Sequence, residues 1–249
     1  MLELRVDGGI AVLTLCRPPV NAMSAEWVAR FDALLDELQG RPEDWSLLHI
    51  RSTQKIFCAG ADLKQLNDNF GRDIEAQLEL GRSYQRLFAR VQDLDAVTLA
   101  EIGGTALGGG LELALACDLR IASSRAKFGF PEVTLGLIPG AGGTQRLSWL
   151  CGRGTASRLI LTGETIDGAE AHRLGIVQWC VEPDRVVAEA ARIAGRVAAV
   201  PRHASAGAKS AILAAADPQV DGFDRETEVV RTCFGSSATR ALVTTFANR

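Results

Sequence analysis

An excess of basic residues is the first thing this sequence lacks. Its 249 residues carry 27 lysines and arginines against 30 aspartates and glutamates, which gives a net charge of −3 at pH 7. Aromatic residues make up only 6% of the chain. A nucleic-acid-binding protein needs a positive field over the phosphates, and single-strand binding adds aromatic stacking. The composition therefore argues against nucleic acid as a partner.

Long apolar runs and spaced metal ligands are also missing. The first ten residues, MLELRVDGGI, carry charges where a secretory leader has its apolar centre, and no run approaches the roughly 18 apolar residues of a membrane span. The three histidines lie far apart, and the six cysteines form no C-x-x-C pair. We therefore expect no membrane segment, no metal site, and reduced thiols in a cytoplasmic protein.

The secondary-structure pattern of the sequence changes near residue 183. Strand and helix patterns mix before that point, whereas 184–199, 202–216 and 220–247 are alanine-rich helical stretches separated by Pro201 and Pro218. The sequence predicts an α/β fold with two regions, a core at 1–183 that holds the active site and a helical region at 184–249.

Local patterns predict several elements of the core. Residues 2–7 and 10–15 around Gly8-Gly9 predict a β-hairpin. Ser24 is a typical N-cap for a helix that Gly40 ends. Further strands are expected at 47–50, 97–102 and 118–122, and further helices at 73–92 and after Gly142-Gly143.

Two glycine clusters precede predicted helices, at 108–110 and at 140–143. Neither is followed by Lys-Ser or Lys-Thr, as a P-loop requires, and neither fits the spacing of a dinucleotide fingerprint. Glycines at a helix start also let a ligand oxygen approach unpaired N–H groups closely, which is how an oxyanion hole is built. We therefore expect backbone donors rather than a nucleotide site.

Two carboxylates lie in apolar surroundings close to these glycines. Glu112 follows Gly110 within a run of leucine and alanine, and Glu132 follows Pro131 in FGFPEVTLGLIPG. One interpretation is a general acid and base pair. The other is that Glu112 only complements the positive end of its helix and that Glu132 faces solvent. Both interpretations stay open at this point.

Three segments together resemble the crotonase, or enoyl-CoA hydratase/isomerase, superfamily. They are FCAGADLKQL at 57–66, ALGGGLELALACD at 106–118 and FGFPEVTLGLIPGAGGTQRL at 128–147. Their order and spacing match the family over nearly the whole chain. The resemblance implies a spiral of ββα units followed by C-terminal helices that pack on neighbouring subunits, giving a homotrimer or a hexamer of two trimers.

The resemblance also implies a site. Ala61 and Gly109 would supply the two oxyanion-hole N–H groups, and Glu112 and Glu132 would be the catalytic pair. The substrate, an acyl-CoA thioester with no further cofactor, would lie along Ala59, Gly60, Ala61, Asp62, Leu63, Lys64, Gly108, Gly109, Pro139 and Gly140. Lys64 would pair with a CoA phosphate, although a solvated surface lysine is an equally good interpretation.

The sequence departs from the family pattern outside these positions. Val97 stands where relatives commonly have proline, and Thr105 replaces a frequent aromatic residue. Glu101 adds a third acid, which we expect to face solvent or a subunit contact because a buried charge needs a partner.

The leading hypothesis is a 2-enoyl-CoA hydratase, since both glutamates are present. A double-bond isomerase on the same scaffold needs only one proton shuttle and remains an alternative. So does a non-catalytic acyl-CoA-binding protein, which would be expected to lose one of the glutamates.

Overall fold

The computed structural model describes residues 1–69 and 73–248. Its larger sheet has the strand order β1-β2-β3-β4-β6-β9, formed by Leu2–Asp7, Gly9–Leu15, Trp45–Ser52, Val97–Ile102, Leu119–Ser123 and Trp179–Val181. The β1-β2 pair is antiparallel, and every later pair in this sheet is parallel. A smaller sheet contains β5 (Ala106–Leu107), β7 (Lys127–Gly129) and β8 (Thr165–Asp167).

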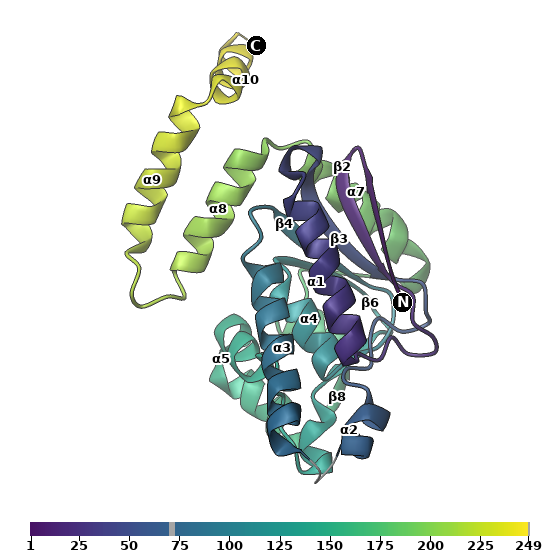
Figure 1. Ribbon diagram of the computed structural model, residues 1–249. Helices are drawn as coiled ribbons and strands as arrows, with labels where there is room; N and C mark the ends of the chain where they lie inside the picture. The colour runs from purple at the N-terminus through teal and green to yellow at the C-terminus, as the bar shows by residue number, and fades with distance from the viewer. Residues whose placement is uncertain (70–72, 249) are drawn as a thin grey trace.

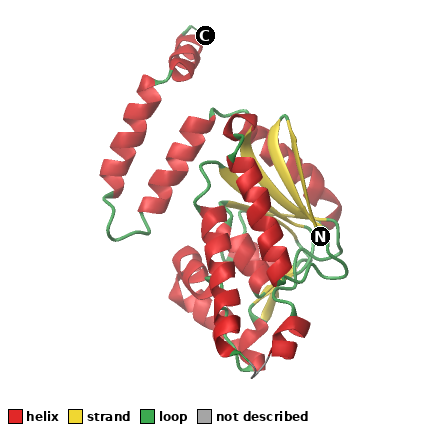
Figure 2. Ribbon diagram, viewed as in Figure 1, coloured by secondary structure: helices red, strands yellow, loops and turns green. Residues whose placement is uncertain are grey.

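Helices cover both faces of the larger sheet (Figures 1 and 2). The helices of the core are α1 (Ala25–Gln39), α2 (Leu63–Asn69), α3 (Ile74–Gln92), α4 (Gly109–Ala116), α5 (Gly143–Thr162), α6 (Gly168–Arg173) and α7 (Val186–Ala198), with short 3-10 turns at Pro42–Asp44, Pro131–Leu135 and Pro183–Arg185. The main apolar core lies between the sheet and helices α1, α3 and α4, whereas α7 packs on the opposite face against Leu47, Leu99 and Ile121.

The expected local signals are confirmed in the first part of the chain. Leu2 pairs with Leu15 across the hairpin, and the Ser24 side chain accepts a hydrogen bond from the Trp27 N–H at the start of α1. Gly40 caps that helix. The helix expected at 73–92 is present as α3, but Ile74 and Leu78 are exposed, so only its C-terminal half packs into the core.

Three C-terminal helices follow, namely α8 (Arg202–Ala214), α9 (Gly222–Gly235) and α10 (Ser237–Ala247). The single helical stretch expected at 220–247 is wrong in one respect, because Ser236 adopts an extended conformation and separates α9 from α10. Figure 1 shows these three helices (green to yellow) reaching away from the core. Since α7 lies on the sheet, the elements that stand apart begin at α8, and the boundary at residue 183 stays a prediction.

Two basic side chains, the buried Lys209 and the partly buried Arg202, anchor α8 to the core. The Lys209 ammonium lies 3.0 Å from an Asp118 carboxylate oxygen and donates to the Ala96 carbonyl at 3.0 Å. The Arg202 guanidinium lies over the Trp45 ring, 5.0 Å from its centroid. A buried charge is tolerated only when it is paired, so these contacts fix where α8 leaves the sheet.

Candidate active site

Glu112 lies on a helix whose residues are all buried. Its own side chain is 3% exposed, and one carboxylate oxygen accepts hydrogen bonds from the Ala141 N–H at 2.7 Å and the Gly143 N–H at 2.8 Å. Burial raises the pKa of the Glu112 carboxyl, while the two N–H donors and the Arg146 charge oppose that rise. The carboxylate is thus held by a separate loop, and the idea that it merely complements its own helix does not explain these contacts.

Glu132 lies on the 3-10 turn Pro131–Leu135 and faces the start of α4. A Cβ atom built on Gly108 would lie 2.6 Å from Glu132 Oε1, so this carboxylate rests against the glycine backbone. Its other oxygen is shielded from solvent and has no hydrogen-bond partner among the described residues. Burial, together with the nearby Glu112 charge, raises the pKa of Glu132 to about 7.

The two carboxyl groups therefore occupy different environments. Burial raises the pKa of both groups, but Glu112 accepts two backbone hydrogen bonds that favour its ionised form, whereas one Glu132 oxygen has no partner among the described residues. Two carboxyl groups with different hydrogen-bond partners are suited to different roles in one reaction. Because the charges interact, their titrations are coupled.

The backbone of the 57–62 segment passes very close to the first turn of α4. A Cβ on Gly60, which has φ +94°, would lie 2.9 Å from the Gly109 N, and one on Gly110 would lie 2.2 Å from the Cys58 carbonyl oxygen. The Ala61 N lies 3.7 Å from the Cβ position of Gly109. Only glycine allows this approach, and it brings the N–H groups of Ala61 and Gly109 into one neighbourhood.

The structure therefore gathers most of the expected site residues around the start of α4. Ala59, Gly60 and Ala61 approach from one side, and Gly108 and Gly109 form the turn itself. The 139–143 loop joins them through the Ala141 and Gly143 N–H groups, with Pro139 buried and Gly140 exposed.

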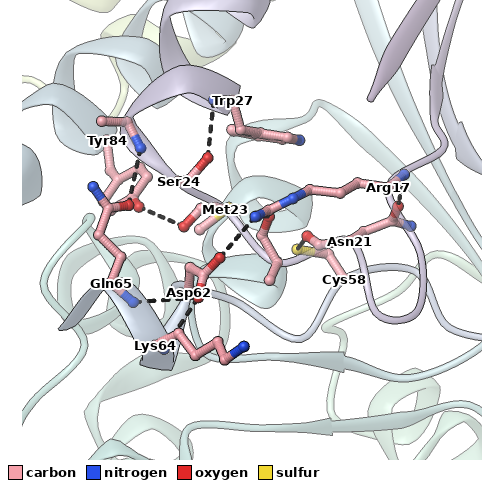
Figure 3. A network of polar contacts seen from close by, with 12 residues as sticks. Arg17, Asn21, Met23, Ser24, Trp27, Cys58, Asp62, Lys64, Gln65 and Tyr84 are labelled. Carbon is pink, nitrogen blue, oxygen red and sulfur yellow. Dashed lines mark hydrogen bonds and ion pairs between the residues drawn. The ribbon is translucent and has the colours of Figure 1, made fainter. Parts of the chain in front are cut away.

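Asp62 and Lys64 line a cavity of about 600 Å³ at the start of α2, and Leu63 lies between them in the chain. Arg17 and Asp62 reach toward each other beside this cavity in Figure 3, and the closest atoms of the pair lie 2.8 Å apart. Burial raises the pKa of Asp62, but the hydrogen bonds from Arg17 and from backbone N–H groups outweigh this effect, so the pKa is lowered overall. The Lys64 and Leu63 side chains are exposed.

Sequence reasoning missed two arginines that the structure places near these residues. Arg17 pairs with Asp62, and Arg146 donates to the Ala141 carbonyl at 3.0 Å directly behind the loop that holds Glu112. The signal for Arg146 was its position four residues after Gly142, in the first turn of α5, facing back toward the glycine loop.

The expectation that Glu101 faces solvent or a subunit contact is wrong for this chain. Glu101 is 6% exposed on the α7 side of the sheet, with an oxygen 2.9 Å from His49 Nε2. Both atoms are shielded from solvent, and the pair is too poorly aligned for a hydrogen bond. Strand β4 alternates its side chains between faces, so Glu101 points away from the two glutamates near α4.

The described part of the chain contains no group of three or more histidine, cysteine, aspartate or glutamate side chains arranged to hold a metal ion. Among its helices, none is long and apolar enough to cross a membrane.

The chain is similar to known enzymes over nearly its whole length. The short-chain-enoyl-CoA hydratase of Clostridium acetobutylicum is 35% identical over 248 residues, which cover 99% of this chain and 94% of that protein. The crotonyl-CoA hydratase of Syntrophomonas wolfei is 34% identical with the same coverage. The crystal structure of an enoyl-CoA hydratase from Bacillus anthracis matches with a TM-score of 0.92 at 31% identity, covering 99% of this chain and 96% of that one.

The family profile described as enoyl-CoA hydratase/isomerase matches residues 5–249. The α/β core and the C-terminal helices agree with the matched structures along almost the entire chain. The resemblance noted in the sequence is thus confirmed, and the chain is a member of the enoyl-CoA hydratase/isomerase family with the crotonase fold.

Proposed function

We propose that this protein is a 2-enoyl-CoA hydratase, which adds water reversibly to a 2-enoyl-CoA to give a 3-hydroxyacyl-CoA. The observation that carries the proposal is the pair Glu112 and Glu132, whose carboxyl groups flank the glycine turn in different electrostatic environments. The names of two full-length relatives, short-chain-enoyl-CoA hydratase and crotonyl-CoA hydratase, favour a short acyl chain.

The proposed oxyanion hole consists of the Ala61 and Gly109 N–H groups. When water adds to the β-carbon of a conjugated thioester, negative charge develops on the carbonyl oxygen. Two rigid N–H donors at that oxygen would each stabilise the transition state by about 3–4 kcal/mol, judged by the loss of single oxyanion-hole donors in other enzymes. The close glycine contacts between the two segments support this assignment.

The two glutamates would divide the proton transfers. Glu112, whose carboxylate form accepts hydrogen bonds from two N–H groups, takes a proton from water while the water oxygen bonds to the β-carbon. Glu132, with a pKa of about 7, holds a proton in much of the protein at neutral pH and delivers it to the α-carbon. One water is consumed, and the proton gained by Glu112 replaces the one lost by Glu132 once it exchanges through solvent.

The CoA portion would run from the glycine turn toward Asp62, Leu63 and Lys64. The exposed Lys64 ammonium beside the 600 Å³ cavity is available to a phosphate, and the Arg17–Asp62 pair would keep the loop in place. The chemistry needs no cofactor beyond the coenzyme A of the substrate. We also propose a cytoplasmic location, as the reduced cysteines lead us to expect.

The alternative is a double-bond isomerase, which would move one proton between carbons and need only one of the two carboxylates. The matched family includes both hydratases and isomerases, so the same site could carry out either reaction. A 3-enoyl-CoA substrate separates the two, because only an isomerase converts it to the conjugated product. A binding protein without activity would bind thioesters and change neither substrate.

We further propose a homotrimer, alone or paired into a hexamer. Helices α8 to α10 carry many exposed large apolar side chains, and exposed apolar surface in such quantity is typical of a protein interface. These side chains are Ile212, Phe223, Val230, Phe234, Leu242, Val243 and Phe246. Light scattering would give the mass, and Phe234→Asp should dissociate the assembly, whereas a monomeric wild-type protein would overturn the proposal.

The activity is tested by following the loss of the conjugated thioester absorbance of crotonyl-CoA, and then of longer 2-enoyl-CoA substrates. Glu112→Gln and Glu132→Gln should each lower kcat by at least about 100-fold, as expected for loss of a general acid or base. Glu43→Gln, which changes an exposed glutamate on the Pro42–Asp44 turn, is the matched control. A wild-type protein that binds the thioesters but hydrates none of them refutes the hydratase proposal.

A further inference from the structure

The loop 139–143, which holds Glu112, is itself fixed from behind by two side chains. The Gln85 amide donates to the Gly140 carbonyl at 2.7 Å, and an Arg146 Nη donates to the Ala141 carbonyl at 3.0 Å. The Gly140 carbonyl and the Ala141 N–H belong to the same peptide group. A donor on that carbonyl therefore polarises the N–H that points at Glu112.

Arg146 is the more firmly held of the two. Its Nε donates to the Gln92 side chain at 2.8 Å, so the guanidinium joins the end of α3 to the glycine loop. A Cβ built on Gly142, which has φ +107°, would lie 2.2 Å from Arg146 Nη1. The guanidinium thus lies directly across the backbone of Gly142, and only a glycine there leaves room for it.

Arg146 and Glu112 contact the same residue of the loop. One Glu112 oxygen accepts the Ala141 N–H, and the carbonyl of the same residue accepts the guanidinium. Burial raises the pKa of Glu112, and the Arg146 charge is the cationic influence that opposes the rise. An arginine remains protonated even where burial lowers its pKa, as it does for Arg146.

The other charged groups of this neighbourhood are acidic or thiol groups. Glu132 faces Glu112 from the 3-10 turn, and Asp93 and Cys117 face Arg146 from the ends of α3 and α4. None of them favours the ionised form of Glu112. Without the guanidinium, the buried carboxylate would keep only its two backbone donors.

We propose that Arg146 is a positioning residue for Glu112, because its guanidinium fixes the loop that holds this carboxylate and its charge favours the ionised form. The inference deepens the proposed function. Only the expected effect of Arg146 on the hydration rate rests on that function. Arg146 touches neither substrate nor reacting atoms in this proposal. It acts on the base by fixing the Ala141 backbone and through the field of its charge.

The test is a titration that needs no substrate. In protein labelled with ¹³C at the glutamate carboxyl carbons, the Glu112 resonance is identified by its loss in Glu112→Gln and is then followed with pH. Arg146→Gln should raise the titration midpoint of Glu112 by about one pH unit, since an opposite charge close to a carboxyl shifts its pKa by roughly 1–3 units. Arg146→Lys, which restores the charge, should return the midpoint most of the way.

Arg90→Gln is the matched control, because Arg90 lies on α3, the helix that Arg146 contacts through Gln92, and pairs with Asp32 and Asp36 on α1. It should lower stability and leave the Glu112 midpoint unchanged. If Arg146→Gln does not fold, Gln92→Leu tests the inference instead, because it removes the hydrogen-bond partner of the Arg146 guanidinium without removing a charge. A smaller upward shift is then expected.

An unchanged Glu112 midpoint in folded Arg146→Gln, or in Gln92→Leu where the first variant does not fold, overturns the inference. If the protein hydrates enoyl thioesters, the acid limb of kcat/KM should move upward together with the midpoint. A protein that shows the titration shift but no hydration would refute the proposed function and leave the role of Arg146 intact. The two failures are therefore distinguishable.

Discussion

Glu132 should make the folded protein less stable as the pH rises, and Glu132→Gln should remove that dependence. The carboxyl is half-buried, and one of its oxygens has no partner among the described residues. Burial, with a contribution from the Glu112 charge, raises its pKa from 4.5 to about 7. Ionising it therefore costs more in the native protein than in the unfolded chain.

The sign and size follow from the protons bound in each state. Between pH 4.5 and about 7 the native protein keeps a proton on Glu132 that the unfolded chain has lost, so stability falls as the pH rises. At about 1.4 kcal/mol per pKa unit, the full effect is about 3.5 kcal/mol, and about 2.5 kcal/mol of stability is lost between roughly pH 5 and pH 8. Glutamine cannot ionise, so Glu132→Gln should gain this amount relative to the wild type over that interval.

The assay is urea unfolding of both proteins at fixed protein concentration across this pH range. The difference in free energy of unfolding between them reports Glu132 together with its coupling to Glu112, because the titrations of distant groups cancel. Thr134→Ala is the matched control. It removes the hydrogen bond from the Thr134 hydroxyl to the Pro131 carbonyl in the same turn and should change stability equally at every pH. A difference between wild type and Glu132→Gln that stays constant with pH would refute the reasoning.

Three other substitutions test separate parts of the structure. Gly108→Ala places a methyl group 2.6 Å from Glu132 Oε1 on a residue with φ +50°. We expect kcat to fall by about 100-fold with little change in KM. An unchanged kcat in steady-state assays would contradict the close contact. Lys64→Ala should raise KM for CoA thioesters but not for pantetheine thioesters, which lack the CoA phosphates, and equal effects on both would remove Lys64 from phosphate binding. Lys209→Met leaves the Asp118 charge beside the sheet unpaired and should cost about 3–5 kcal/mol in thermal unfolding, whereas a cost below about 1 kcal/mol would show that the pair is solvated.

Local patterns gave good predictions where neighbouring residues decide the structure. The hairpin around Gly8-Gly9 and the cap at Ser24 depend on turn geometry and on a single hydroxyl, and both signals are short-range. The break at Ser236 was missed because residues 220–247 have helical composition throughout, and periodicity does not reveal a single extended residue. Glu101 was misplaced because a strand residue points to one face or the other, and only the packing of α7 shows that both faces are covered.

The sequence by itself determined the family and the chemical groups available to it, since the glycine turns, the two glutamates and their spacing are local and specific motifs. Their assembly required tertiary structure. Three contacts join segments that are distant in the chain. Gly60 approaches Gly109, the 139–143 loop binds Glu112, and Arg146 contacts the back of that loop. Such contacts depend on how the helices pack on the sheet, and the proton affinities of the two glutamates follow from the burial that this packing creates.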